Sequence, residues 1–257
     1  MTGMFTLAQW EWFRFRRRIS ALVLLALVAF IVLAALGVAA ALNEGWVDFF
    51  GEVGYFPVAA GAVGAVSPFL AIVLAAFIYA MDLQGGSCRT LAARGTSRLV
   101  ILCSKALACV VLLVALHIFA LGAATLFALV SNPGFLEWRD GLESMGASLL
   151  NSFLYLSLGI ALAHWRQSVA FTVGIGIGLI FFEAVFYPLA EGLGQIQGWP
   201  IREFTAWTLR GVTLGLQGES HLFGAAWYIP IVAAYSCGLA CLAVLAFNKF
   251  DLKAGGD

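Results

Sequence analysis

Charged residues are scarce in this chain, and their scarcity limits the classes of protein to which it can belong. Of 257 residues, 14 are basic and 14 are acidic, while 62% are hydrophobic. The mean hydropathy is +0.97. A soluble domain needs far more polar surface than this composition supplies. The chain is therefore expected to be an integral membrane protein.

Sequence signatures of catalysis and metal binding are also missing. The five cysteines contain no C-x-x-C pair, which disfavours a zinc site or a disulfide framework. No G-x-x-x-x-G-K-[ST] occurs, so this chain is not expected to bind ATP through a P-loop. No G-x-S-x-G or H-E-x-x-H points to a hydrolase. We expect no enzyme activity, no metal and no cofactor in this chain itself.

Long apolar runs are what the sequence does have. A span needs about 20 apolar residues to cross a bilayer. Runs of that kind occupy 19–42, 59–81, 101–130, 147–164, 168–190 and 226–247. They do not alternate as the strands of outer-membrane barrels do. The sequence predicts a single all-α transmembrane domain over 1–257 with six transmembrane helices.

Basic residues are distributed unevenly between these runs. With both termini inside, 11 of the 14 basic residues lie on the inner side, and Arg139, Arg202 and Arg210 lie outside. The positive-inside rule therefore predicts a multi-pass protein of the cytoplasmic membrane, with both termini in the cytoplasm. Because the basic clusters stay at the membrane ends, they do not indicate a nucleic-acid-binding surface.

Residues 1–18 are rich in aromatic and basic side chains. Apolar residues, Trp12 among them, recur there at helical spacing, whereas Arg14 and Arg18 fall on another face. This pattern predicts an interfacial helix that lies along the inner surface of the bilayer. The alternative is a simple basic flank that only sets the topology.

A polar, basic island over 82–100 separates the second and third runs. Gly85, Gly86 and Gly95 predict turns on either side of a short helix, roughly 87–94. Ser97 is placed to cap the third span. Positive-inside topology explains the arginines of this island but not its glycine and serine residues at this spacing. We interpret the island as a docking surface.

The segment 191–225 is too apolar for a free outer loop, since it contains Trp199, Trp207 and several aliphatic residues. We expect short amphipathic or re-entrant helices there. The repeated glycines of Gly174-Ile175-Gly176-Ile177-Gly178 lie within a predicted span and favour helix packing over nucleotide binding.

Two polar residues lie deep within predicted spans. Glu183 is the one acid well inside a run, and His117 lies at a comparable depth in another. An ionisable residue at such a depth is costly and is a functional candidate by default. We hypothesise that the two face a shared interior, as a pair or along a substrate path. The alternative is that each reaches the outer interface separately.

The island resembles the first cytoplasmic loop of ABC-2 type transporter permeases. The family's pattern is an acidic residue, Gly-Ser/Thr, a basic leucine-rich turn, Gly/Pro-x-Ser-Arg and then Lys seven positions on. It is carried here by Asp82, Gly86-Ser87, Arg89, Leu91, Gly95-Thr96-Ser97-Arg98 and Lys105. Two residues depart from the pattern, because Asp82 replaces a more common Glu and Gly95 replaces a more common Pro. The shorter Asp82 side chain leaves its partner open.

The resemblance covers essentially the whole chain and implies a fold and a function. The implied fold is that of an ABC-2 (type V exporter) permease with an N-terminal interfacial helix, as in bacteriocin-immunity and drug-export systems. The implied partners are cytoplasmic ABC ATPase subunits, which hold ATP and Mg, and a second permease chain in the lipid bilayer. The residues implied to couple the loop to the ATPase are Asp82, Gly86, Ser87, Arg89, Leu91, Arg94, Ser97 and Arg98.

The resemblance also implies a cargo class. Short outer loops favour export or flipping, and the apolar interior favours an amphipathic or hydrophobic substrate such as a peptide antibiotic, a drug or a lipid. The alternative function is a stand-alone secondary transporter or channel. That reading predicts matched internal repeats, which the loops 43–56 and 164–167 do not provide, because they differ in length and charge.

Overall fold

The computed structural model has helices and turns but no strand in the part of the chain that it describes. That part is residues 6, 7, 9, 10, 13, 19–45, 54–93, 95–131, 138–197, 201–218 and 224–249. Six helices in this part are long and apolar enough to cross a membrane, which confirms the prediction of six long apolar helices. Trp12, Arg14 and Arg18 of the predicted interfacial helix lie outside the described residues.

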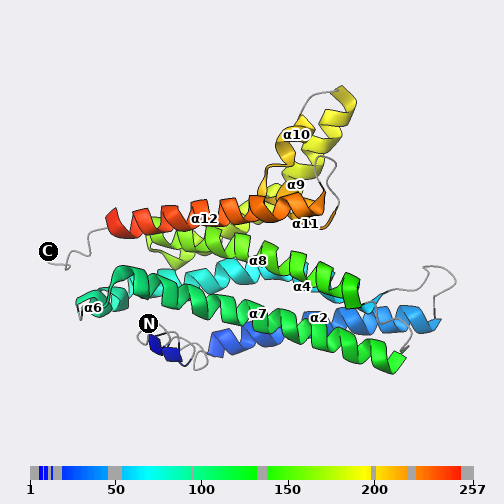
Figure 1. Cartoon of the computed structure of the whole chain (residues 1–257), viewed down its shortest axis with the longest axis horizontal. Helices are drawn as coiled ribbons and strands as arrows, with labels where there is room; N and C mark the ends of the chain where they lie inside the picture. The colour runs from blue at the N-terminus through cyan, green and yellow to red at the C-terminus, as the bar shows by residue number, and fades with distance from the viewer. Residues whose placement is uncertain are drawn as a thin grey trace.

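The elements follow one another through a bundle of antiparallel spans (Figure 1). The six long helices are α2 (Ile19–Gly45), α4 (Tyr55–Ala75), α7 (Arg98–Ser131), α8 (Trp138–Arg166), α9 (Val169–Gln197) and α12 (Ala225–Lys249). The short ones are η1 (Ala76–Ala80), α5 (Met81–Gln84), α6 (Ser87–Ala93), α10 (Ile201–Thr205) and α11 (Leu209–Leu216). We call the end of the bundle that carries α6 the α6 end.

Two of the long helices extend well past the predicted apolar runs. Helix α8 begins at Trp138 rather than near 147, and α9 continues to Gln197 rather than ending near 190. The first turn of α8 holds an exposed pair between Arg139 and Glu143, with Nε and Oε1 3.1 Å apart. Such a pair supports a helix without adding apolar length. The hydropathy of a run therefore locates a span but not the ends of its helix.

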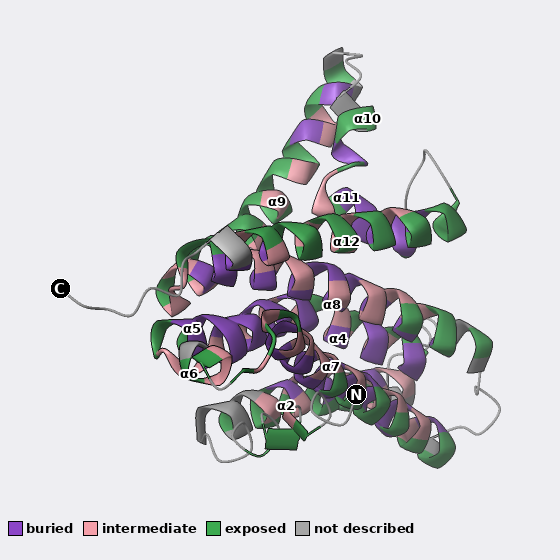
Figure 2. Cartoon of the chain, turned by 60° about the vertical axis from the view of Figure 1, so that its left-hand side comes forward, coloured by how far each residue is buried: buried purple, intermediate pink, exposed green. Residues whose placement is uncertain are grey.

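Three helices form the centre of the bundle. In α4, α7 and α8, 56%, 44% and 61% of the most apolar segment is buried, against 22%, 11% and 11% in α2, α9 and α12. Figure 2 shows the same division, with α9 and α12 exposed over much of their length. The exposed apolar surface of these outer helices suits lipid or a neighbouring chain.

Helices α4 and α8 run parallel and pack closely because small residues line their contact. A Cβ atom at Gly141 would lie 2.7 Å from the Phe56 ring, and one at Gly159 would lie 2.7 Å from Ala75 Cβ. Real Cβ atoms do not approach so closely, so glycine is required at both levels. Without a hydrophobic drive between helices in lipid, such close backbone contact is what holds spans together.

The segment 191–225 contains the end of α9, then α10 and α11. Figures 1 and 2 both show the far part of α9 rising away from the bundle with α10 beside it. Helix α11 returns to the bundle and contacts α8, α9 and α12. Gly215 of α11 lies against the Tyr228 ring, where a Cβ atom would come within 2.4 Å. The chain is therefore folded back on itself before the last span.

Candidate functional site

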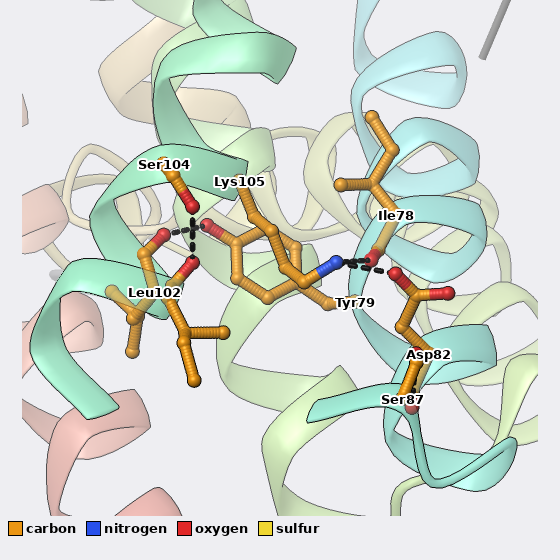
Figure 3. A network of polar contacts seen from close by, with 8 residues as sticks. Ile78, Tyr79, Asp82, Ser87, Leu102, Ser104 and Lys105 are labelled. Carbon is orange, nitrogen blue, oxygen red and sulfur yellow. Dashed lines mark hydrogen bonds and ion pairs between the residues drawn. The ribbon is translucent and has the colours of Figure 1, made fainter. Parts of the chain in front are cut away.

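A buried ion pair joins the two ends of the polar island. Lys105 of α7 is 1% exposed and Asp82 of α5 is 4% exposed. The Lys105 ammonium contacts Asp82 Oδ2 and donates to the carbonyl of Ile78, with 3.1 Å between Nζ and O (Figure 3). A buried charge is tolerated only when it is paired and hydrogen-bonded. Lys105 is the partner of Asp82 that the sequence pattern left open.

The helix that leads into Asp82 is widened by a π-helical turn, η1. Such turns are rare and occur often at functional sites. Tyr79, within this turn, donates its hydroxyl to the carbonyl of Leu102 at 2.7 Å. Ser87 donates to the backbone carbonyl of Asp82 at 3.1 Å. Figure 3 shows the bonds of Tyr79 and Lys105, and together with the Ser87 bond they tie η1, α5 and the start of α6 to α7. We call Tyr79, Asp82, Ser87 and Lys105 the lysine cluster.

The turns on either side of α6 need their glycines. Gly86 and Gly95 have φ angles of 74° and 83°, a left-handed conformation that costs a residue with a Cβ atom energy but costs glycine little. Ser97 immediately precedes helix α7, and its Oγ accepts from the Val100 N–H at 3.3 Å. This confirms the predicted cap. Helix α6 is thus held between two defined turns.

Several predicted coupling residues make contacts within the chain. Arg98 donates through Nη1 to the carbonyl of Phe247 at 3.3 Å, which satisfies a backbone oxygen near the end of α12. Leu91 is partly buried against the core. Among the α6 residues whose side chains the structure describes, Thr90 and Ala93 are exposed. The side chain of Arg89 and all of Arg94 lie outside the described residues.

His164 is a member of this end of the bundle that the sequence interpretation missed. Its ring lies between those of Tyr79 and Phe247, with both centroid distances 5.2 Å, and its Nδ1 donates to the carbonyl of Ile160 at 2.8 Å. The sequence placed His164 in a turn between spans, whereas α8 extends through Arg166. The sequence signal for this residue would have been a histidine one turn inside the end of a span, since a polar residue at such a place needs a partner.

A second polar group runs along one face of α8, which we call the α8 ladder: Ser148, Asn151 and Tyr155. These positions are spaced i, i+3 and i+7, so they share a face. Ser148 Oγ lies 3.2 Å from His117 Nε2 of α7. Thr213 of α11 donates to Asn151 Oδ1 at 2.7 Å. Tyr155 donates to Glu183 Oε2 of α9 at 3.4 Å. Each of the three residues therefore bonds to a different helix: Ser148 to α7, Asn151 to α11 and Tyr155 to α9.

His117 and Glu183 are not joined to each other. His117 Nδ1 donates to the carbonyl of Leu113 at 2.8 Å, so in the neutral ring Nε2 accepts from Ser148. The other oxygen of Glu183, Oε1, accepts from the backbone N–H of Leu209 at 3.0 Å. Helix α8 thus connects to both residues at different levels, and the hypothesised direct pair is absent from the described structure.

Glu183 supplies an acceptor for the first turn of α11, which begins beside the middle of α9. The first N–H groups of a helix have no partner within it, and an unpaired donor in an apolar interior is costly. The Glu183 carboxylate accepts from the first residue of α11, Leu209. Thr208 Oγ1 accepts from Gly211 N at 3.1 Å. The negative group at a helix N-terminus is stabilising.

No metal centre is indicated. The described residues include no group of three His, Cys, Asp or Glu side chains that could hold a metal ion. The five cysteines are free thiols on several helices.

These observations define a helical membrane protein with one polar cluster at the α6 end and a second along α8. Residues 58–253 match the model of a family described as protein of unknown function (DUF2705), and the chain belongs to this family. The match extends from near the start of α4 to beyond the end of α12. No curated protein matches the chain.

Proposed function

We propose that this chain is the permease subunit of an ATP-driven ABC-2 transporter that exports or flips an amphipathic or hydrophobic molecule. The observation that carries the proposal is the buried ion pair between Asp82 and Lys105. These two residues stand at opposite ends of the motif that resembles ABC-2 permeases, and their contact closes the island into one folded unit. Six span-capable helices around that unit support the same reading.

The lysine cluster gives the island the stiffness that mechanical coupling needs. A force that a partner exerts on a flexible loop displaces only the loop. A loop that is hydrogen-bonded to two spans transmits the force to those spans. Tyr79 and Lys105 link η1 and α5 to α7, and Ser87 links α6 to α5. A force on α6 therefore reaches α4 and α7 together.

The surface of α6 that an ATPase would contact is the exposed one, with Thr90 and Ala93. Arg89 lies beside it in sequence and supplies a positive charge for an acidic partner surface. Charge complementarity of this kind sets partner choice and association rate more than affinity. ATP and Mg would bind in the partner chains, and two permease chains in the cytoplasmic membrane would enclose the path.

A pull-down in mild detergent from the native host tests the proposal. We expect the tagged chain to recover a soluble P-loop ATPase in stoichiometric amount. Ala93→Glu should release it because it places negative charge on the exposed face of α6, and Arg89→Glu should release it because it reverses a positive charge of the same helix. Arg98→Glu is a poorer probe, since it also removes the bond to Phe247.

Arg139→Glu is the matched control, because it makes the same charge change at an exposed site at the far end of the bundle. It should leave the ATPase bound. Recovery of the chain alone in several detergents, without ATPase activity, would favour a stand-alone secondary transporter or channel. Loss of the ATPase with Arg139→Glu as well would mean that α6 is not the contact.

A further inference from the structure

A buried hydroxyl group without a partner lies in the middle of α4. Ser67 is 0% exposed, and its Oγ has no hydrogen-bond partner among the described residues. Ser157 of α8, by contrast, uses its own helix, because its Oγ donates to the carbonyl of Phe153 at 2.8 Å. An unpaired polar atom in an apolar interior costs free energy, and such atoms are few in native proteins. The Ser67 hydroxyl is therefore a group to which a bound molecule can donate or from which it can accept.

The residue after Ser67 frees a second polar group of α4. Pro68 lies inside the helix and has no N–H, so the carbonyl of Gly64 lacks the donor that an α-helix would give it. Within a membrane, a carbonyl freed in this way is satisfied by a side chain, a neighbouring helix or water. Gly64 and Ser67 are three positions apart and share a face of the helix, but the Ser67 hydroxyl does not bond to that carbonyl. This face therefore presents one hydroxyl that can donate and one carbonyl that can accept.

The same face of α4 meets polar residues of α8, because the two helices keep one register along their contact. The close approaches pair Phe56 with Gly141, Gly64 with Ser148 and Ala75 with Gly159. This register places Ser67 opposite Asn151 and Ser152, which are 4% and 0% exposed. Ser148 gives its proton to His117 Nε2, so its oxygen keeps a lone pair for a further donor. Uncharged polar groups of two helices are thus gathered at one level of the bundle.

Small residues of α4 leave an approach to this level. Gly61 is exposed, and a Cβ atom there would meet nothing within 4 Å. Gly64, three positions deeper, is half-buried, and a Cβ atom there would lie 4.0 Å from Nε2 of Gln217. Gln217 is itself exposed, at the end of α11. Burial therefore increases stepwise along one side of α4 from Gly61 to Ser67, and the unpaired hydroxyl stands at the inner end.

We propose that Gly64, Ser67, Ser148 and Asn151 bind the hydroxyl group of an uncharged amphipathic molecule, and we call them the hydroxyl site. A hydroxyl group suits the two unpaired groups, because it can accept from Ser67 and donate to the Gly64 carbonyl. A carboxylate or an ammonium is disfavoured, since none of these four residues offers it an opposite charge. The site rests on the proposed transport function, for which it specifies the polar group of the cargo.

Photolabelling of the purified chain in nanodiscs of neutral lipid tests the site. The probe is an octanol that carries a diazirine, and it is compared with an octylammonium and an octanoate that carry the same diazirine. Mass spectrometry of peptides locates the adducts. The alcohol should label 61–67 and 148–152 in preference to the other two probes, and unlabelled octanol should compete. Ser67→Ala should lower this labelling about fivefold, because it removes one hydrogen bond to the alcohol. Equal labelling by all three probes, or none in these segments, overturns the site.

A matched control and a melting experiment separate recognition from a structural role. Ser157→Ala removes a hydroxyl that already bonds within its own helix, and it should leave the labelling unchanged. Without alcohol, Ser67→Ala should melt no lower than the parent, because it removes an unpaired buried hydroxyl. Octanol should raise the melting temperature of the parent more than that of Ser67→Ala. A lower melting temperature of Ser67→Ala without alcohol would mean that the hydroxyl serves the fold, and it overturns the site. Gly64→Ala, which narrows the approach through ordinary contacts, should also reduce labelling.

Failure of the site and failure of the proposed function give different results, because the labelling needs neither an ATPase nor transport. A chain that recovers its ATPase but does not bind the alcohol overturns the hydroxyl site and leaves the permease proposal standing. A chain that binds the alcohol at 61–67 but recovers no ATPase overturns the permease proposal and supports the site as a binding site alone.

Discussion

Replacing Lys105 with methionine perturbs the ion pair on which the proposed function rests. The substitution removes the ammonium and keeps an unbranched side chain that fills similar space. It removes the ammonium that contacts the carboxylate of Asp82, which is 4% exposed, and takes one donor from the carbonyl of Ile78. Removing one partner of a buried ion pair costs about 3–5 kcal/mol. For a chain of this size that lowers the melting temperature by about 10 °C.

A double-mutant cycle shows whether this cost belongs to the pair. Asp82→Asn alone should be destabilising to a similar extent, because it removes the negative charge that the buried Lys105 ammonium contacts. The double variant Asp82→Asn/Lys105→Met strands neither charge, so its loss should be smaller than the sum by about 2 kcal/mol or more. Melting in detergent is followed with a fluorogenic maleimide, since Cys88 and Cys109 are buried and become reactive on unfolding.

The exposed pair between Arg139 and Glu143 is the control for this cycle. Its side chains are 89% and 67% exposed, and exposed pairs contribute little because water screens them. Arg139→Ala should leave the melting temperature unchanged. A melting temperature of Lys105→Met equal to that of the parent, or strictly additive losses in the cycle, would refute the reasoning, since a buried pair cannot lose its cation without cost.

Three further outcomes are expected. Tyr79→Phe should lower stability by about 1 kcal/mol, because the carbonyl of Leu102 loses its donor in a buried site; melting in detergent measures it. Gly159→Val should prevent close contact of α4 with α8, whereas Gly146→Val, on the same helix with no neighbour within 4 Å, should be tolerated; yield of monodisperse protein separates the two. Cysteines at Ala93 and Arg139 should be labelled from the cytoplasmic and the external side respectively, as the predicted topology requires.

Apolar runs were enough to predict the six long helices, because the cost of leaving a backbone unpaired in lipid makes a run of that length helical. The glycines of the island correctly predicted its turns, since Gly86 and Gly95 adopt the left-handed conformation that breaks a helix. The helix ends were harder to predict. Helix α8 begins at Trp138, in a stretch with too many polar residues for a hydropathy pattern to mark it as part of the span.

The partners of the polar residues could not be read from the chain in the same way. The depths of His117 and Glu183 along their helices follow from counting residues, but the direction in which each side chain points does not. Equal depth suggested that the two meet, whereas α8 supplies a separate partner to each. The acceptor role of Glu183 depends on α11, which begins 26 positions later in sequence, and no local pattern connects them.

Helix α8 gives the two polar groups a mechanical relation. His164 packs against Tyr79 of the lysine cluster at one end of α8, and Tyr155 holds Glu183, and through it the start of α11, nearer the middle. The two positions are about 14 Å apart along an uninterrupted helix. The same helix is packed against α4 through glycine contacts too close to slide without a clash. A displacement of η1 and α5 would therefore be transmitted to α8, and through Tyr155 and Glu183 to the start of α11.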